Sequence, residues 1–497
     1  MDLSKINLGS PAAERDSGLD QYFVRSDAFR RVADGSKRIV IGNRGAGKSA
    51  IFQFLASEHR RKPSTSIIEL SPEDYSYELL RETMAAEAEG SWQKQSAYGA
   101  AWKYLLYVLV MKSIAKDVPG GSRGSGLAQI KKYIRDHHQG GQNSTLDALI
   151  SYLKRLEGIK IGPYEAGVKT RELQKLYKLE EISTLLPCLQ EVLNRHTVVI
   201  FVDELDRGWD AGEDAQAFVA GLFQACLALN GISKNLRLYM SLRQELYENI
   251  PALYEDAQKV RDLIENVRWD EPGLKKLLVQ RLRHSISEID SQKVAPGVED
   301  DEIWNSIFSE TLAYRQTNSF NYVVDRTLYR PREIIQFCTQ IIESGITMGT
   351  SEPLDYPVFV EAEHIYSEER AKDIAAEYRF QYPGLLRIFE AFRGHTYTFD
   401  REELEDLCTE IIVSDRKSSD ELEWASELEP EHLIELLWRV GFLRAQAVGG
   451  IKGRHRSGSQ YVGAYQVGSL DLAGILRFQV HPLYRSWLTM REPKGTK

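Results

Sequence analysis

A glycine-rich segment with the pattern G-x-x-x-x-G-K-S, at residues 42–49, constrains this chain more than any other part of its sequence. It follows a short apolar run and precedes apolar residues at helical spacing, which is the order strand, loop, helix. Glycine lets the backbone wrap closely around an anion, because a Cβ there would clash or forbid the required dihedral angles. Backbone N–H groups and the positive helix end then face the anion. The segment therefore predicts a phosphate-binding loop.

The residue types in this loop predict a nucleoside triphosphate with Mg²⁺ as the ligand. Lys48 is expected to reach the β- and γ-phosphates, and the Ser49 hydroxyl is expected to hold Mg²⁺. A glycine-rich turn with a chance lysine is the alternative, and the complete motif after an apolar strand argues against it. The residues expected to contact the nucleotide here are Gly42, Asn43, Arg44, Gly45, Ala46, Gly47, Lys48, Ser49 and Ala50.

A second apolar run, at residues 198–202, ends in two acids, Asp203 and Glu204. Five consecutive apolar residues, mostly β-branched, indicate a strand that is buried on both faces, as in parallel sheets. Asp203 is expected to hold Mg²⁺, directly or through water, and Glu204 to orient and deprotonate the attacking water. A solvated strand end is the alternative, which the glycine-rich loop upstream disfavours.

Three arginines are candidates for contact with the phosphates. Residues 236–243 read as a strand that ends in Arg243, and ligands of open α/β sheets bind beyond the carboxyl ends of strands. Arg243 is thus a candidate γ-phosphate sensor, with a surface arginine as the alternative. Arg330 and Arg332 flank a proline at a predicted helix start, where cations oppose the helix dipole. Basic residues at a position that favours acidic ones often mark a functional site. One of the two is expected to face the phosphates, with a simple salt bridge as the alternative.

The chain of 497 residues is long enough for about three domains, at roughly 150 residues per domain. We expect an α/β fold, in which a parallel-sheet P-loop core is followed by a helical lid and a winged-helix domain. The predicted boundaries are a mobile arm at 1–17, the core at 18–270 with a helical insertion at about 72–193, the lid at 271–382 and a winged-helix-like section at 383–497.

The last section suggests a winged helix because its order is helix, strand, basic hairpin, strand. The hairpin carries Lys452, Arg454, His455 and Arg456. These side chains suit contact with nucleic-acid phosphates, so DNA is a possible partner. A hairpin tip is also commonly charged only to remain solvated, and this alternative stays open.

Composition limits the other classes of function. The formal net charge of -9 gives no global basic field for nucleic acid, although a local patch is compatible with it. The four cysteines lie far apart and fit neither a disulfide framework nor a zinc site. No apolar run approaches the roughly 20 residues that span a bilayer. We therefore expect a cytoplasmic protein without a membrane partner.

With these residues collected, the chain resembles the bacterial P-loop ATPases allied to the AAA+, STAND and KAP branches of the additional-strand, conserved-glutamate class. The glycine-rich loop and the acidic strand end are the specific matches, and the rest are weaker. The matching segments are residues 42–51, 201–210, 241–243, 329–333 and 478–483.

The resemblance implies binding of ATP and Mg²⁺, a lid that carries a sensor arginine, and conformational switching. It also implies a homo-oligomer and a protein effector partner, often in anti-phage defence, and makes Arg207 a candidate trans-acting or structural arginine. A regulatory switch ATPase is the leading interpretation. A DNA-binding loader or clamp-type ATPase that uses the winged helix is the main rival. A scaffold that holds ATP without turnover is a third, and Glu204 argues against it.

Overall fold

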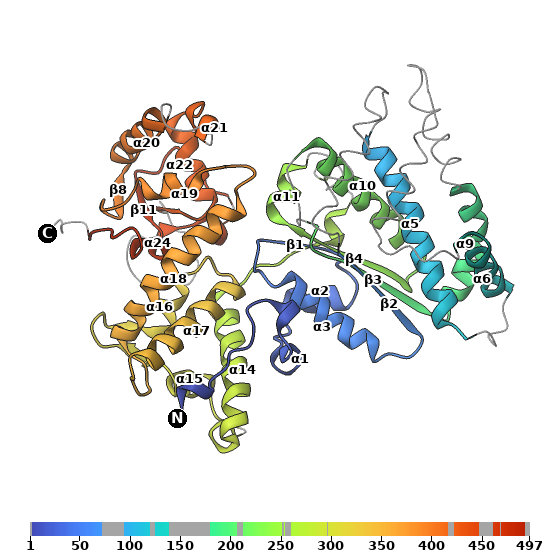
Figure 1. Cartoon of the computed structure of the whole chain (residues 1–497), viewed down its shortest axis with the longest axis horizontal. Helices are drawn as coiled ribbons and strands as arrows, with labels where there is room; N and C mark the ends of the chain where they lie inside the picture. Colours follow the sequence, from blue (N-terminus) through green and yellow to red (C-terminus); the bar gives the residue numbers. More distant parts are fainter. Residues whose placement is uncertain are drawn as a thin grey trace. The chain divides into compact units, whose positions relative to one another are not determined.

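The computed structural model describes residues 2–71, 94–119, 125–138, 179–205, 212–250, 253, 260–295, 297–415, 422–446, 461–467 and 469–492. The chain divides into two compact units, and each is described by itself (Figure 1). Unit 1 comprises Met1–Val24, Arg44–Ala46 and Arg268–Lys497. Unit 2 comprises Arg25–Asn43 and Gly47–Val267.

Unit 2 is built on a five-stranded sheet with the order β2-β3-β4-β1-β5, and every neighbouring pair is parallel. This sheet confirms the predicted α/β class. Strand β4 lies between β1 and β3, so the strand before the glycine-rich loop and the strand before the acid pair are separated by one strand. The strands are β1 (Ile39–Gly42), β2 (Thr65–Leu70), β3 (Thr197–Val202), β4 (Leu236–Arg243) and β5 (Ile264–Asn266).

Helices cover both faces of the sheet, which is why its central strands are apolar throughout. On one face Phe52 of α3 (Lys48–Arg60) packs against Phe201 and Tyr239. These two residues are paired across β3 and β4, and their rings stack with centroids 5.4 Å apart. The alternate residues of the same strands, such as Ile200 and Met240, belong to the buried cluster that also contains residues of α5 (Lys94–Asp117) and α10 (Glu213–Asn230). Helices α5 and α10 pack along each other in Figure 1.

The helices of unit 2 are α2 (Asp27–Ala33), α3 (Lys48–Arg60), α5 (Lys94–Asp117), α6 (Ser125–His137), α9 (Leu179–Leu193), α10 (Glu213–Asn230), α11 (Gln244–Asn249) and the 3₁₀ helix η4 (Arg261–Leu263). Within the predicted insertion at about 72–193, the described residues form α5, α6 and α9. The remaining parts of that prediction lie outside the described residues.

Unit 1 joins a helical section and a C-terminal section through one buried apolar cluster. The helices of the first part are α14 (Glu271–Ile289), η5 (Ser291–Val294), α15 (Asp300–Asn305), α16 (Ser319–Val324), α17 (Pro331–Thr347) and α18 (Tyr356–Glu377). Its two short strands, β6 (Thr311–Leu312) and β7 (Thr317–Asn318), pair antiparallel. The C-terminal helices are α19 (Leu385–Glu390), α20 (Arg401–Asp415), α21 (Glu423–Ser426), α22 (Pro430–Arg439), α23 (Ala464–Val467) and α24 (Pro482–Arg485).

The C-terminal section also contains an antiparallel sheet with the order β10-β9-β11-β8. Its strands are β8 (Thr398–Asp400), β9 (Leu443–Gln446), β10 (Tyr461–Val462) and β11 (Arg477–Val480). The predicted basic hairpin, with Lys452, Arg454, His455 and Arg456, lies outside the described residues. The winged helix therefore stays a prediction.

The first 24 residues differ from the mobile arm that the sequence predicts for 1–17. They form η1 (Leu3–Lys5), η2 (Ala13–Arg15) and α1 (Leu19–Tyr22), and both Leu3 and Leu8 join the apolar cluster of unit 1. Arg281 of α14 fixes this segment by donating to the Leu8 carbonyl at 2.6 Å and to the Asp16 carboxylate at 2.9 Å. The Tyr22 hydroxyl also donates to Asp16. Two buried leucines and a buried ion pair explain why a polar segment is held in place.

In the part of the chain that the structure describes, no helix has the length and apolar character needed to cross a membrane.

We predict that Arg281→Ala lowers the free energy of unfolding of the full chain by about 3–5 kcal/mol, because it leaves the Asp16 carboxylate buried without its cation. The two side chains are 7% and 2% exposed. Urea denaturation measures the loss. The control is Arg439→Ala, since Arg439 pairs with Glu435 at a site where both side chains are about half exposed, and such pairs contribute about 0–1 kcal/mol. Equal losses in the two variants would contradict the assignment.

Candidate functional site

The glycine-rich loop connects β1 directly to α3, as its sequence context predicts. Gly45 and Gly47 have φ of 78° and 94°, in the left-handed region that glycine tolerates best. Gly47 is the N-cap of α3, and the first turn of this helix contains no acidic residue. The positive end of the helix dipole is therefore not neutralised by a side chain of its own first turn, which favours an anion there.

The predicted loop residues take distinct places around this turn. Gly42 is the last residue of β1, and Ser49 and Ala50 lie in the first turn of α3. The Lys48 side chain folds back over the loop, since its Nζ donates to the carbonyl oxygens of Gly42 at 2.7 Å and Asn43 at 3.0 Å. The ammonium group thus lies against the loop, where an anion bound by the loop meets a positive charge.

The carboxyl ends of β1, β4 and β3 lie side by side at one edge of the sheet. In the pairing register Gly42 lies opposite Arg243, and Val202 lies opposite Met240. Neighbouring strands are about 4.8 Å apart, so the ends of β1 and β3 are separated by roughly 10 Å across β4. The strand topology therefore brings the start of the loop, Arg243 and Asp203 to the same edge.

Asp203 is held in place by two donors. The Ser241 hydroxyl of β4 and the Glu204 backbone N–H, at 2.9 Å, both donate to the Asp203 Oδ1 atom. Glu204 has a φ of 57°, which is uncommon for a residue with a side chain and is often found at functional sites. The carboxylate of Asp203 is thus fixed at the sheet edge, and the chain turns sharply directly after it.

Ser241 is a candidate site residue for which the sequence analysis predicted no role. It is 3% exposed and lies in a strand whose neighbouring positions are mainly apolar. A buried hydroxyl requires a hydrogen-bond partner, and a polar residue within an apolar run is the signal that was available for it.

Residues 44–46 of the loop belong to unit 1, where Arg332 and Trp269 contact them. The Arg332 backbone N–H donates to the Gly45 carbonyl at 3.3 Å, and the Trp269 Nε1–H donates to the Ala46 carbonyl at 2.9 Å. Burial, and then the nearby Arg44 cation, lower the pKa of the Arg332 guanidinium. Sequence reasoning selected Arg332 but missed Trp269, because a lone tryptophan before a helix has no distinctive pattern.

Arg330 lies in a buried cluster of ion pairs within unit 1. Its guanidinium contacts Glu377 at 2.8 Å and Glu333 at 3.6 Å, and Glu333 also pairs with Arg370 at 3.2 Å. Each of the four side chains is at most 7% exposed. This arrangement corresponds to the salt-bridge alternative for Arg330. Arg207 lies outside the described residues.

The chemistry of the candidate metal ligands, Ser49 and Asp203, suits Mg²⁺. This ion is usually held by one or two carboxylates together with substrate phosphates and water, and not by a cage of protein ligands alone. Among the described residues no group of three or more His, Cys, Asp or Glu side chains is placed to hold a metal. A single anchored carboxylate and a hydroxyl near a phosphate-binding loop therefore form a fitting donor set.

Comparison with known proteins gives partial similarities. Residues 272–375, in the helical section of unit 1, match the family described as the FunZ-associated C-terminal helical domain. The chain is also 23% identical to the "Putative transposon gamma-delta 80.3 kDa protein" of Escherichia coli (strain K12), over 98% of this chain and 67% of that protein. The structure of the Aeropyrum pernix ORC2 protein (ADPNP–ADP complexes) aligns with 96% of this chain and 91% of the ORC2 chain, at 11% identity and a TM-score of 0.34.

We predict that Gly45→Ala destabilises the chain by about 1–3 kcal/mol more than Gly394→Ala, as measured by urea denaturation. A Cβ at Gly45 would lie 2.9 Å from the Arg332 Cβ, whereas a Cβ at Gly394 would meet nothing within 4 Å. The two glycines have φ of 78° and 76°, so the backbone strain of about 1–2 kcal/mol is common to both variants. Equal losses would show that the loop and Arg332 are not in close contact.

Proposed function

We propose that this protein binds ATP with Mg²⁺ at the carboxyl edge of β1, β4 and β3, and hydrolyses it. The observation that carries the proposal is one juxtaposition: a loop with two left-handed glycines opens α3, one strand away from a carboxylate that Ser241 holds. Phosphates, magnesium and an attacking water need these groups at the same edge of a sheet.

Each residue of the site has a separate role in this proposal. The N–H groups of residues 42–50 and the positive end of α3 bind the phosphates, and Lys48 exchanges its contacts with the loop carbonyls for the β- and γ-phosphates. Ser49 and Asp203 hold Mg²⁺, which neutralises charge on the phosphates when it is bound. Ser241 orients the carboxylate of Asp203.

Glu204 supplies the base for hydrolysis. It follows the anchored Asp203 directly, and its left-handed backbone turns the chain at the point where the strand ends. A carboxylate there accepts a proton from water as the water attacks the γ-phosphate. Arg243 and Arg332 are the arginines proposed to face the phosphates, since Arg330 already has two carboxylate partners in its buried cluster.

Beyond hydrolysis we propose a regulatory switch. The loop is shared between the two units, because residues 44–46 belong to unit 1 while residues 42–43 and 47–50 belong to unit 2. A ligand bound by this loop therefore alters contacts within both units, which is how a γ-phosphate produces a conformational change in switch proteins. A homo-oligomer that controls a protein effector, in anti-phage defence among other settings, is the narrower form of this proposal and rests on the family resemblance alone.

We predict that Glu204→Gln retains ATP binding but lowers the rate of ATP hydrolysis by about 10²–10⁴-fold, because the amide cannot accept the proton of the attacking water. Turnover in the presence of Mg²⁺ and titration with a fluorescent ATP analogue measure the two effects. Full turnover in Glu204→Gln would reject the role of Glu204. The particle size of this variant, measured with and without ATP, tests the switch, and an unchanged size and shape would argue against it.

Lys48→Ala provides the control for this experiment. It removes the charge at the loop and is expected to abolish ATP binding as well as turnover, while the fold of unit 2 is retained. If Lys48→Ala and Glu204→Gln lose binding equally, the separation of binding and chemistry between these two residues is wrong.

A DNA-acting ATPase is the second candidate. Strands β9 and β10 pair antiparallel, and residues 447–460, which contain Lys452, Arg454 and Arg456, connect them in the sequence. We predict for this alternative that the chain binds duplex DNA with an affinity that falls steeply with salt. Binding must disappear when these three residues are replaced by glutamine. Absence of DNA binding at low salt, measured by fluorescence anisotropy, would remove the alternative.

A further inference from the structure

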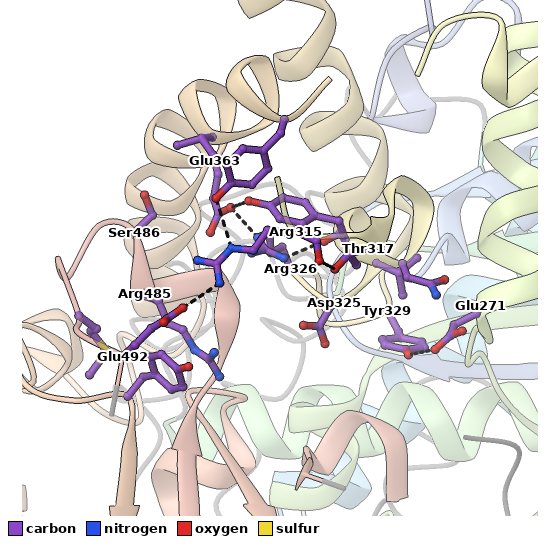
Figure 2. Close-up of a pocket in the computed structure, with 17 residues that line it drawn as sticks. Glu271, Arg315, Thr317, Asp325, Arg326, Tyr329, Glu363, Arg485, Ser486 and Glu492 are labelled. Atoms are coloured by element: carbon purple, nitrogen blue, oxygen red, sulfur yellow. Dashed lines mark hydrogen bonds and ion pairs between the residues drawn. The ribbon is translucent and has the colours of Figure 1, made fainter. Parts of the chain in front are cut away.

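A polar pocket of about 980 Å³ lies within unit 1, apart from the glycine-rich loop (Figure 2). Side chains of α16, α18, the connection between β6 and β7, and the C-terminal segment around α24 line it. Its volume is within the range of small-molecule sites. None of the roles proposed above for ATP hydrolysis uses this pocket.

Most charged side chains of the pocket are already paired. Arg326 contacts Glu363 at 2.6 Å, and Arg315 contacts Glu492 at 2.8 Å, as the dashed lines in Figure 2 show. The Asp325 carboxylate accepts from Arg444, which lies outside the lining, at 2.6 Å. Among the described residues, two charged lining side chains form no ion pair: Glu271, which accepts from the Tyr329 hydroxyl at 2.6 Å, and Arg485.

Arg485 is the cation of these two. Its Nε donates to the Val480 carbonyl at 2.8 Å and its Nη2 to the Gln479 side chain at 3.2 Å, and both acceptors are neutral. Among the described residues no carboxylate forms an ion pair with it, and its Nη1 takes part in no hydrogen bond. Burial, and then the neighbouring Arg444 cation, lower the pKa of Arg485 to about 10. The Asp325 carboxylate opposes this shift of the pKa but forms no ion pair with Arg485. A partly buried guanidinium with a free Nη1 and no ion-paired carboxylate favours an anion.

Aromatic rings provide the other half of the pocket. Four tyrosines are among its lining residues: Tyr322, Tyr329, Tyr356 and Tyr397. The Tyr397 ring lies 3.9 Å from the Arg485 guanidinium carbon, so the cation and an aromatic face occur together. The Tyr356 ring stacks on Tyr314, which is 85% exposed, with the centroids 5.7 Å apart. Such rings favour stacking with a flat, unsaturated group.

We propose that this pocket is a binding site for a small aromatic anion, a planar ring that carries one phosphate or carboxylate group. Arg485 holds the anionic group through its free donors, and the tyrosine rings cover the planar part. The ligand is a small molecule and not a nucleic-acid strand, because the lining contains four acids and three arginines. A polyanion would also meet the carboxylates of Glu271 and Glu492, which line the same pocket, and would be repelled.

The test is isothermal titration of the full chain with phenyl phosphate, with benzoate and with inorganic phosphate, at one ionic strength. We expect saturable binding of phenyl phosphate, benzoate or both with Kd below about 1 mM, and at least tenfold weaker binding of inorganic phosphate. The aromatic probe that binds more tightly shows whether the site prefers a phosphate group or a carboxylate group. Absence of saturable binding of both aromatic probes would overturn the proposal.

Variants locate the site. We expect Arg485→Gln to weaken binding at least tenfold and Arg485→Lys to restore part of it, since lysine keeps the charge but loses the planar fork. The matched control is Arg477→Gln in β11, whose exposed partner is Asp400 at 2.9 Å and which does not line the pocket. It is expected to bind within twofold of the unchanged chain. Unaltered binding by folded Arg485→Gln would overturn the proposal.

Two further variants cover the remaining outcomes. If Arg485→Gln fails to fold, judged by circular dichroism, Tyr356→Leu carries the test, because it keeps apolar volume but loses the stacking face. A loss of at least threefold supports the proposal, and no loss contradicts it. Lys48→Ala must bind the aromatic probes normally, since loss of binding in that variant would place the probes at the glycine-rich loop.

Discussion

The hydrogen bond from the Ser241 hydroxyl to the Asp203 carboxylate is the interaction on which the candidate site depends. It exists because β4 lies between β1 and β3, so that a residue of the intervening strand reaches the acid at the end of β3. The same strand places Arg243 opposite the last residue of β1. One strand thus sets both the spacing between loop and acid and the orientation of the acid. A carboxylate without this donor would have a choice of rotamers at the sheet edge.

In unit 1, buried ion pairs hold separate segments of the chain together. The ion pairs Asp16–Arg281, Arg330–Glu377 and Arg444–Asp325 all join segments that are distant in the sequence. Such pairs add little net stability compared with apolar contacts, but removing one partner is costly. They therefore fix which segments meet, while the apolar cluster supplies the burial. Arg485 differs from Arg281, Arg330 and Arg444, since no carboxylate among the described residues forms an ion pair with it.

The parallel sheet could be predicted because its central strands are continuous apolar runs, which few other structures accommodate. The glycine-rich loop and the acid pair directly follow those runs. Once the strands are predicted, both features are therefore predicted to lie at strand ends. The packed N-terminal segment could not be predicted, because two leucines among polar residues have no periodicity, and the cation for Asp16 lies 265 residues away. Arg330 and Arg332 show the same limit. Two arginines beside one proline look alike in sequence, and only tertiary contacts place one in an ion-pair cluster and the other beside Gly45.

The packing of the first 24 residues against α14 also affects the order in which the chain can assemble. Leu3, Leu8 and Asp16 precede unit 2 in the chain, whereas α14, which supplies Arg281, follows the whole of unit 2. Domains generally fold as units during synthesis, with the N-terminal one first. Here unit 2 can form its five-stranded sheet before the N-terminal segment meets its partners in α14. The apolar groups of this segment and the Asp16 carboxylate therefore lack their native partners until α14 has been made.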